Sequence, residues 1–335
     1  MSLSAASRIG RRRKAEARGA VRLVVLGDLV LDIVARGDGP VEAASDVSGT
    51  VRFRQGGSAA NTARTFAGLG GRAAFIGAVG RDQWTRRLTA AVRTEGVTVH
   101  AVPVSRPTAR LVALLGTDGE RSFVVERGAA DALDAADLDA AWFRSCDALH
   151  LPGYSLFTQP LASAAMRGAD LARDRGAIIS IDLSSRAPLL ALGRRRAREV
   201  LEELRPTVVF GNRGEVTALT GARQEERLLR LSPIVVVKEG AAGCRVLARA
   251  GEGTEVLRLT VATTTMVARD TTGAGDAFDA GFLFSLLTRP RDGGSALRER
   301  DPVPRDAGSL RRAAVAGHRA ATSLLRAPRP ELPDR

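Results

Sequence analysis

The chain has few cysteines and histidines, and no apolar stretch long enough to cross a membrane. Its apolar runs fall short of the roughly 18 residues that a spanning helix needs, so no membrane association is predicted. Cys146 and Cys244 give neither a disulfide framework nor a metal-ligand spacing, and they indicate a cytoplasmic, reducing location. The three histidines are scattered, which argues against a histidine metal site. The basic residues near the N-terminus are not followed by an apolar core before Val21, so we do not expect a secretory signal there.

Lysine is nearly absent as well. Lys14 and Lys238 are the only lysines among 50 basic residues, and the formal net charge is +13. The arginines are dispersed along the chain, and residues 194–205 interleave them with glutamates as a solvated helix does. Aromatic residues make up only 4% of the chain, so no platform for stacking nucleic-acid bases is predicted. The composition therefore does not favour nucleic acid as a partner, whereas the positive charge favours small polyanions such as nucleotides.

Apolar periodicity predicts strands and helices in regular alternation. The predicted strands are 21–26, 73–79, 147–151, 177–182, 207–210 and 233–237. The predicted helices are 58–69, 84–94, 158–175, 194–204, 213–220, 276–288 and 308–325. This order is typical of an α/β fold in which helices cover both faces of a mostly parallel central sheet.

Two segments interrupt the alternation. Residues 33–54 and 98–127 lack helical periodicity and contain β-prone runs, with a candidate hairpin turn at Gly116–Gly119. We expect a small antiparallel sheet that stands off the main domain as a lid, and its open edges suggest a homodimer through the lid. The predicted organisation is a basic disordered extension (1–20), one domain (21–325) with this lid, and a tail (326–335).

The segment Arg269–Gly281, with the sequence RDTTGAGDAFDAG, carries the strongest chemical signal. A Thr- and Val-rich extended segment precedes it, and the apolar residues 277–287 that follow predict a buried helix. Free backbone N–H groups and a helix dipole at a glycine-rich helix start attract a phosphate. Asp276 lies where it could accept a proton from an attacking hydroxyl, although an acidic residue in the first turn also stabilises a helix by itself.

Three further segments place polar groups after predicted strands. Asp32 follows the first strand, and a carboxylate at such an edge can accept hydrogen bonds from vicinal hydroxyls. The run Gly56–Asn61 (GGSAAN) opens the first long helix and combines close backbone approach with an amide. Asn212 and Glu215 begin another helix and also fit a capping box.

Together these four segments resemble the PfkB family of carbohydrate kinases, which have the ribokinase-like fold. The resemblance spans residues 21–325, with Gly56–Asp82 and Asp270–Gly281 similar to the two family signatures. It implies a three-layer ribokinase-like α/β domain with a small β-sheet lid. It also implies ATP- and Mg²⁺-dependent phosphorylation of a hydroxyl of a small sugar or sugar derivative.

The resemblance assigns roles residue by residue. Asp276 is implied as the catalytic base, and the backbone of Gly273, Ala274 and Gly275 as the anion hole. The other implied positions are the sugar contacts Asp32, Gly56, Gly57 and Asn61, the nucleotide and Mg²⁺ positions Asn212, Glu215, Lys238, Gly240 and Gly243, and the K⁺ loop positions Asp270 and Thr272. For Lys238, an exposed strand-end lysine is the alternative to a phosphate contact.

The sequence also departs from the family pattern. Val30 stands where ribokinases tend to have a sugar-binding Asn, which argues against ribose as the substrate. Asp279 replaces a frequent Asn, and we expect a modest effect. Arg127 and Tyr154 are candidates for shaping specificity, or else packing residues.

Two alternatives to a sugar kinase remain at this point. A nucleoside kinase would need an apolar slot for the base, for which the candidates are Phe53, Phe123 and Tyr154. A non-catalytic sugar or nucleotide sensor on the same scaffold is the alternative of another class. Which sugar or nucleoside is used depends on pocket shape, which these motifs do not encode.

Overall fold

In the computed structural model, the described residues are 20–40, 44–116, 121–222, 224–249, 255–264, 270–288, 303–327 and 330–332. The predicted basic extension lies outside them except for residue 20, as do the centre of the Gly116–Gly119 turn and residues 265–269. Among the described residues, no helix combines the length and the apolarity that a membrane span requires.

A nine-stranded sheet forms the centre of the molecule, in the order β13-β12-β11-β10-β9-β8-β1-β4-β5. All pairings from β5 to β11 are parallel, and β12 pairs antiparallel with both neighbours. The strands of this sheet are β1 (Arg22–Leu26), β4 (Arg72–Val79), β5 (Thr98–Pro103), β8 (Ala148–Pro152), β9 (Ile178–Asp182), β10 (Val208–Asn212), β11 (Ile234–Lys238), β12 (Cys244–Arg249) and β13 (Val256–Val261).

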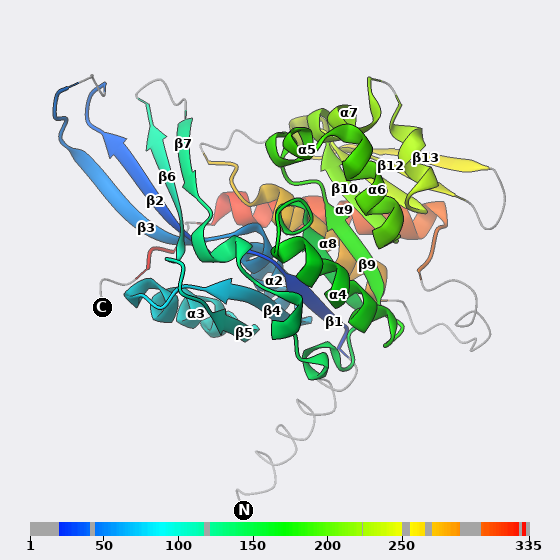
Figure 1. Cartoon of the computed structure of the whole chain (residues 1–335). Coiled ribbons are helices and arrows are strands. Elements are labelled where there is room, and N and C mark those ends of the chain that lie inside the picture. Colours follow the sequence, from blue (N-terminus) through cyan, green and yellow to red (C-terminus); the bar gives the residue numbers. More distant parts are fainter. Residues whose placement is uncertain are drawn as a thin grey trace, which may run out of the picture.

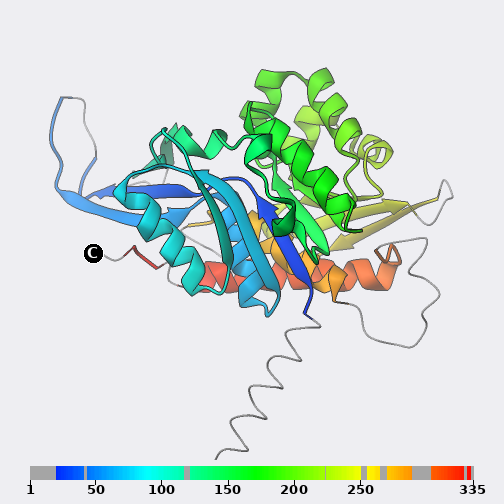
Figure 2. The same ribbon diagram turned by 60° about the horizontal axis from the view of Figure 1, so that its bottom comes forward.

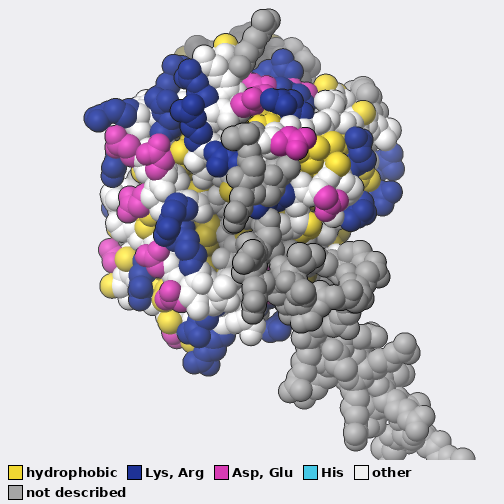
Figure 3. Space-filling model, turned by 90° about the vertical axis from the view of Figure 1, so that its right-hand side faces the viewer, with side chains coloured by type: hydrophobic (Ala, Val, Ile, Leu, Met, Phe, Trp, Pro, Cys, Tyr) yellow, Lys and Arg dark blue, Asp and Glu magenta, His cyan; other side chains and the backbone are white. Residues whose placement is uncertain are grey.

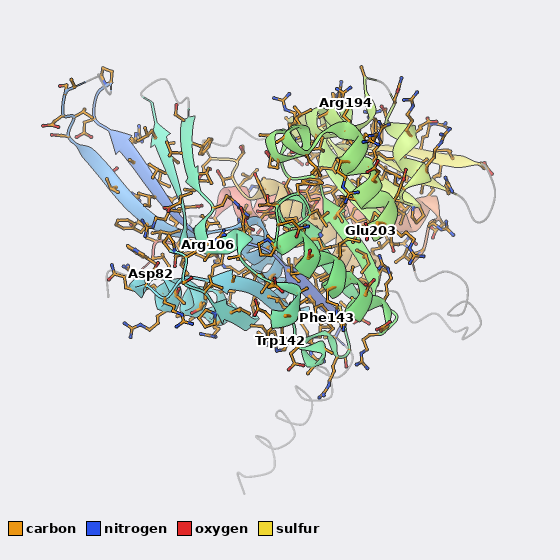
Figure 4. All side chains as sticks on the ribbon, in the orientation of Figure 1. Asp82, Arg106, Trp142, Phe143, Arg194 and Glu203 are labelled. Atoms are coloured by element: carbon orange, nitrogen blue, oxygen red, sulfur yellow. The ribbon has the colours of Figure 1, made fainter. Side chains whose placement is uncertain are left out.

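Helices cover both faces of this sheet, which gives three layers (Figure 2). On one face lie α2 (Ser58–Gly68), α3 (Gln83–Thr94), α8 (Ala274–Leu287) and α9 (Ala307–Arg326). On the other lie α4 (Leu161–Arg173), α5 (Arg186–Leu192), α6 (Arg194–Leu204) and α7 (Arg213–Thr220). Arg194 and Glu203 mark the two ends of α6 in Figure 4. Each face buries its own apolar cluster, because the parallel strands are apolar on both sides. The predicted α/β fold is confirmed, whereas α5 and β12 were not expected.

A separate four-stranded sheet, called the lid sheet below, projects from one side of the domain (Figure 1). It has the order β3-β2-β6-β7 and consists of β2 (Val30–Gly37), β3 (Gly49–Gly56), β6 (Ala109–Leu115) and β7 (Arg121–Glu126). Asp82 joins its base to α3, since its carboxylate accepts hydrogen bonds from the backbone N–H groups of Trp84 and Thr108 (Figure 4).

One expectation about the lid is wrong. Residues 98–103, expected in the lid sheet, form β5 and pair in parallel with β4 at the edge of the main sheet. The intervening helix α3 completes a β–α–β unit, which is the connection that parallel neighbours require. Val99 and Ala101 lie on the apolar side of this alternating strand, and that side packs against the core of the main domain.

The charged surface agrees with a dispersed distribution of arginine. On the face in Figure 3, basic side chains lie among acidic and uncharged ones rather than in one stripe. Several are paired with acidic residues, for example Arg258 with Glu226 at 2.8 Å and Arg196 with Glu199 at 3.2 Å.

Candidate active site

The polar candidates meet at the carboxyl edge of the parallel strands. Because β11, β10, β9, β8 and β1 are neighbours in that order, the residues that end them lie side by side. Lys238 ends β11, Asn212 ends β10 and Asp182 ends β9, while Asp28 comes just after β1. This edge is where open α/β sheets bind ligands.

The N-terminus of α8 carries Asp276. Gly273 is the N-cap in a left-handed conformation (φ 77°), and no side chain caps this helix. The Asp276 carboxylate accepts a 2.6 Å hydrogen bond from the Ser58 hydroxyl and a 2.9 Å bond from the Asn61 amide. Burial raises the pKa of Asp276 to about 6, despite the lowering effect of these two hydrogen bonds. A carboxylate with such a pKa is suited to accept a proton near neutral pH.

Glycines bring the start of α2 against this carboxylate. Gly57 has φ 101°, and a Cβ there would lie 2.5 Å from the Asp28 carbonyl oxygen. A Cβ on Gly56 would lie 2.2 Å from an Asp32 carboxylate oxygen, so glycine is needed at both positions. The structure thus brings Asp32, Gly56 and Gly57 together, and Asn61 links them to Asp276.

An arginine closes the side of the site next to the lid. Arg127 donates from Nη1 to Asp28 and from Nε to Asp131, each at 3.0 Å, and its guanidinium lies 4.8 Å from the Tyr154 ring centroid. Burial opposes the charge on Arg127, but the two carboxylates outweigh it and raise its pKa. For the neighbouring Tyr154, by contrast, burial itself raises the pKa of the phenol. The Arg127 guanidinium is therefore already paired with two carboxylates, which argues against its pairing with an anionic substrate.

Asn212 and Glu215 form the capping box that the sequence predicted. The Glu215 backbone N–H donates to Asn212 Oδ1 at 2.9 Å, and the Asn212 backbone N–H donates to Glu215 Oε2 at 2.8 Å. Burial raises the pKa of Glu215. Gly240 and Gly243 shape the turn between β11 and β12, and a Cβ on Gly243 would lie 2.2 Å from the Val261 carbonyl oxygen.

The described residues contain no group of three or more His, Cys, Asp or Glu side chains that could hold a metal ion directly. Asn212 and Glu215 fit a Mg²⁺ that keeps its waters and is bound chiefly by nucleotide phosphates. At the predicted K⁺ loop, Asp270 accepts from the Thr272 backbone N–H at 3.1 Å and forms a 3.5 Å ion pair with Arg54. Arg54 thus places a positive charge beside Asp270, and binding of K⁺ at this loop stays a prediction.

Lys238 is buried rather than exposed, so the exposed alternative is wrong. Its ammonium lies 2.9 Å from Asp182 Oδ2 and 3.1 Å from Asp279 Oδ2, and its side chain is 14% exposed. Asp279 has no exposed surface at all.

Sequence reasoning missed Asp28, Ser58 and Asp182 as site residues. Asp182 ends a predicted buried strand as Lys238 does, which is the signal that could have identified it. Ser58 is the third residue of the GGSAAN segment, so its position inside a recognised motif is the signal that could have identified it.

A cavity of about 410 Å³ opens beside the site, with Asn61, Thr272 and Gly273 in its wall. A second cavity of about 630 Å³ lies farther from Asp276 and is bounded by α3 and residues 330–332.

The comparisons with known proteins agree with this site and fold. Residues 21–328 match the sequence profile described as pfkB family carbohydrate kinase. Fructokinase-1 of Oryza sativa subsp. japonica is 31% identical over 287 residues, which cover 81% of this chain and 85% of that protein. Adenosine kinase from Sinorhizobium meliloti superposes with a TM-score of 0.72 at 26% identity, covering 93% of this chain and 96% of the other. A probable sugar kinase from Rhizobium etli superposes with a TM-score of 0.73, also at 26% identity, over 92% and 95% of the two chains. The glycine-flanked carboxylate at the start of α8 is thus part of a fold shared with known kinases, and the chain belongs to the PfkB family of carbohydrate kinases.

Proposed function

We propose that this kinase transfers the γ-phosphoryl group of ATP to a hydroxyl of a small neutral sugar. The carrying observation is the Asp276 carboxylate, which lies at the uncapped start of α8 and is held by Ser58 and Asn61. Phosphoryl transfer depends mainly on positioning and on stabilisation of charge, and this arrangement supports both.

Asp276 would accept the proton of the attacking hydroxyl. Its two hydrogen bonds fix the orientation of the carboxylate, and the backbone N–H groups of Gly273, Ala274 and Gly275 would stabilise the charge on the transferred group. The Ala274 N–H donates to the Thr271 carbonyl oxygen at 3.1 Å in this structure and would have to turn from it to the phosphoryl group. Asp32 and Asn61 would orient the sugar hydroxyls. Mg²⁺ bound with the nucleotide would neutralise phosphate charge, with Asn212 and Glu215 holding its waters.

The charges around the acceptor side favour a neutral substrate. Asp28, Asp32 and Asp276 contribute three carboxylates there, and the cationic Arg127 is already paired with Asp28 and Asp131. A sugar phosphate or a sugar acid would bring a further negative charge next to these groups, which costs binding energy.

Between a sugar and a nucleoside, the aromatic residues favour the sugar. Phe53 packs on Trp84 at 5.0 Å, and the strand alternation puts it on the opposite face of the lid sheet from Asp32. The Tyr154 ring is covered by Arg127. Phe123 alone among the three candidates lies on the face of Asp32 with its ring exposed. The plant fructokinase relatives agree with a fructose-like acceptor, and the adenosine kinase neighbour keeps a nucleoside as the second candidate.

A substrate screen tests the proposal. ADP release from ATP would be measured with fructose, glucose, ribose, fructose 6-phosphate, gluconate and adenosine. We expect turnover with a neutral sugar and at least about a hundredfold loss of kcat in Asp276→Asn, because the base is removed. The exposed Asp170→Asn is the matched control and should keep wild-type activity. Full activity in Asp276→Asn would refute the base assignment, and a preference for adenosine would favour the nucleoside kinase.

We also propose that two copies associate through their lid sheets. The lid sheet exposes Val51, Leu114 and Val124 on the face opposite Asp32, and Phe123 and Val125 on the face of Asp32. A second copy packed on the face opposite Asp32 would cover the first three together with an open edge of the sheet, and it would leave the substrate side accessible.

A further inference from the structure

A buried cluster of three charged residues lies directly beneath the candidate anion hole. Asp182 comes from β9, Lys238 from β11 and Asp279 from α8, one helical turn after Asp276. The Lys238 ammonium lies 2.9 Å from Asp182 Oδ2 and 3.1 Å from both carboxylate oxygens of Asp279. Three elements of the fold therefore converge on one ammonium group.

The cluster contains two carboxyl groups and one ammonium. Burial raises the pKa of Asp279 well above its usual value, and a hydrogen bond with Asp182 adds to this rise. For Asp182, burial is outweighed by the Lys238 ammonium, and its pKa is lowered. The consistent state has Asp182 ionised, Asp279 protonated and Lys238 charged, so that the buried group as a whole is neutral.

The ammonium of this cluster lies close to the backbone that would bind phosphate. A Cβ placed on Gly275 would lie 3.2 Å from Lys238 Nζ, so a side chain there would displace the ammonium by a few tenths of an ångström. The Phe210 ring lies 5.9 Å from the same ammonium, and Glu215 adds a carboxyl group from α7.

We propose that Asp182 and Asp279 hold Lys238 as a positioning residue, whose ammonium supports negative charge both at the Gly273–Gly275 backbone and on Asp276. This inference rests on the proposed function, and it gives Lys238 a role beneath the anion hole instead of a direct contact with the nucleotide. A fixed charge in a site that excludes water needs no reorganisation during the reaction, which is how preorganised charges accelerate phosphoryl transfer.

The charged and polar groups that face Asp276 set the direction of the test. Ser58 and Asn61 donate to it from α2, while Lys238 of β11, Asp182 of β9 and Tyr154 after β8 interact with it electrostatically. Lys238 favours the ionised carboxylate, and Asp182 disfavours it. Removing one or the other charge must therefore move the ionisation of Asp276 in opposite directions.

The experiment measures kcat/KM for the sugar as a function of pH in Lys238→Met and Asp182→Asn. The acid limb should move to higher pH in Lys238→Met and to lower pH in Asp182→Asn, each by about one unit. Arg258→Met removes an exposed, distant cation and is the matched control, with no expected shift. Limbs that do not move, or that move together, in folded variants would overturn the inference. Should Lys238→Met fail to fold, the downward shift in Asp182→Asn decides alone.

Nucleotide binding gives a readout that does not depend on the acceptor. By calorimetry, Lys238→Met should bind ADP and a non-hydrolysable ATP analogue about tenfold more weakly than wild type, while Asp182→Asn, which keeps the ammonium but removes one of its two partners, should show a smaller loss. Weaker binding in Lys238→Met with no turnover of any acceptor by the wild type would refute the proposed function and keep the inference. If the wild type turns over a sugar but both variants keep the wild-type nucleotide affinity and pH limbs, the inference is refuted and the proposed function stands.

Discussion

Replacing Asp276 by asparagine should make the protein more stable while it abolishes catalysis. Burial raises the pKa of this carboxyl from 3.8 to about 6, so the folded state disfavours its ionised form. A shift of this size corresponds to about 3 kcal/mol of lost stability where the group is ionised in both the folded and unfolded states. The neutral amide in Asp276→Asn avoids this cost.

The gain depends on pH in a defined direction. Between the unfolded and folded pKa values the folded state binds more protons, so the stability of the wild type falls as pH rises from about 4 to about 6. The advantage of Asp276→Asn should therefore be largest above about pH 7 and roughly half as large at about pH 5. Asn61 can still donate to the amide oxygen and Ser58 can accept from the amide nitrogen, so little hydrogen bonding is lost.

The assay is urea unfolding followed by circular dichroism at about pH 5 and about pH 7.5, with the apo proteins. We expect a net gain of about 1–3 kcal/mol at the higher pH, because some loss of the charge-assisted hydrogen bonds offsets the upper value. Asp170→Asn, at an exposed carboxylate, should show no such gain. A variant less stable than the wild type at about pH 7.5, or a gain of the same size at both pH values, would refute the reasoning.

Three further outcomes are expected. Ser58→Ala removes the 2.6 Å hydrogen bond that lowers the pKa of Asp276, so the acid limb of kcat/KM should move about one unit to higher pH; an unmoved limb in the folded variant would contradict this. Since Arg54 supplies the positive charge beside Asp270, wild-type turnover should differ little between KCl and NaCl, and Arg54→Gln should become more dependent on K⁺; strong activation of the wild type by K⁺ would show the opposite. If the proposed dimer forms through the lid sheet, Val124→Asp should be a monomer in light scattering where the wild type is a dimer, because an exposed apolar residue of β7 becomes charged; a variant that is still dimeric would contradict an interface at this residue.

Local pattern was sufficient to predict much of the fold. Most of the parallel strands are short apolar runs such as β9, and most of the helices carry apolar residues at helical spacing as α4 does, so both periods were visible in the sequence. The glycine-rich start of α8 was also predictable, because Gly273 has the left-handed conformation that glycine adopts easily. The approach of Asn61 to Asp276, 215 positions apart, was expected only through the family resemblance.

The partner of a strand is not encoded in its own pattern. Residues 98–103 alternate as lid strands do, and their place at the edge of the main sheet depends on α3 and on apolar contacts made elsewhere in the chain. Likewise, the sequence marks Phe53 as apolar without showing that Trp84 occupies its ring.

The charged cluster shows why a departure from a family pattern is best interpreted with its neighbours in space. Asp279 was expected to have a modest effect because it was considered alone, yet a carboxyl with no exposed surface is costly to bury unless it is protonated or paired. Lys238, 41 positions away, contacts both of its oxygens, and the ammonium would itself be costly to bury without the ionised Asp182. The effect of Asp279 therefore depends on Lys238 and Asp182, which its own position in the sequence does not show. In an arginine-rich chain, the sole lysine among the described residues lies at the position where a compact ammonium fits beneath Gly275.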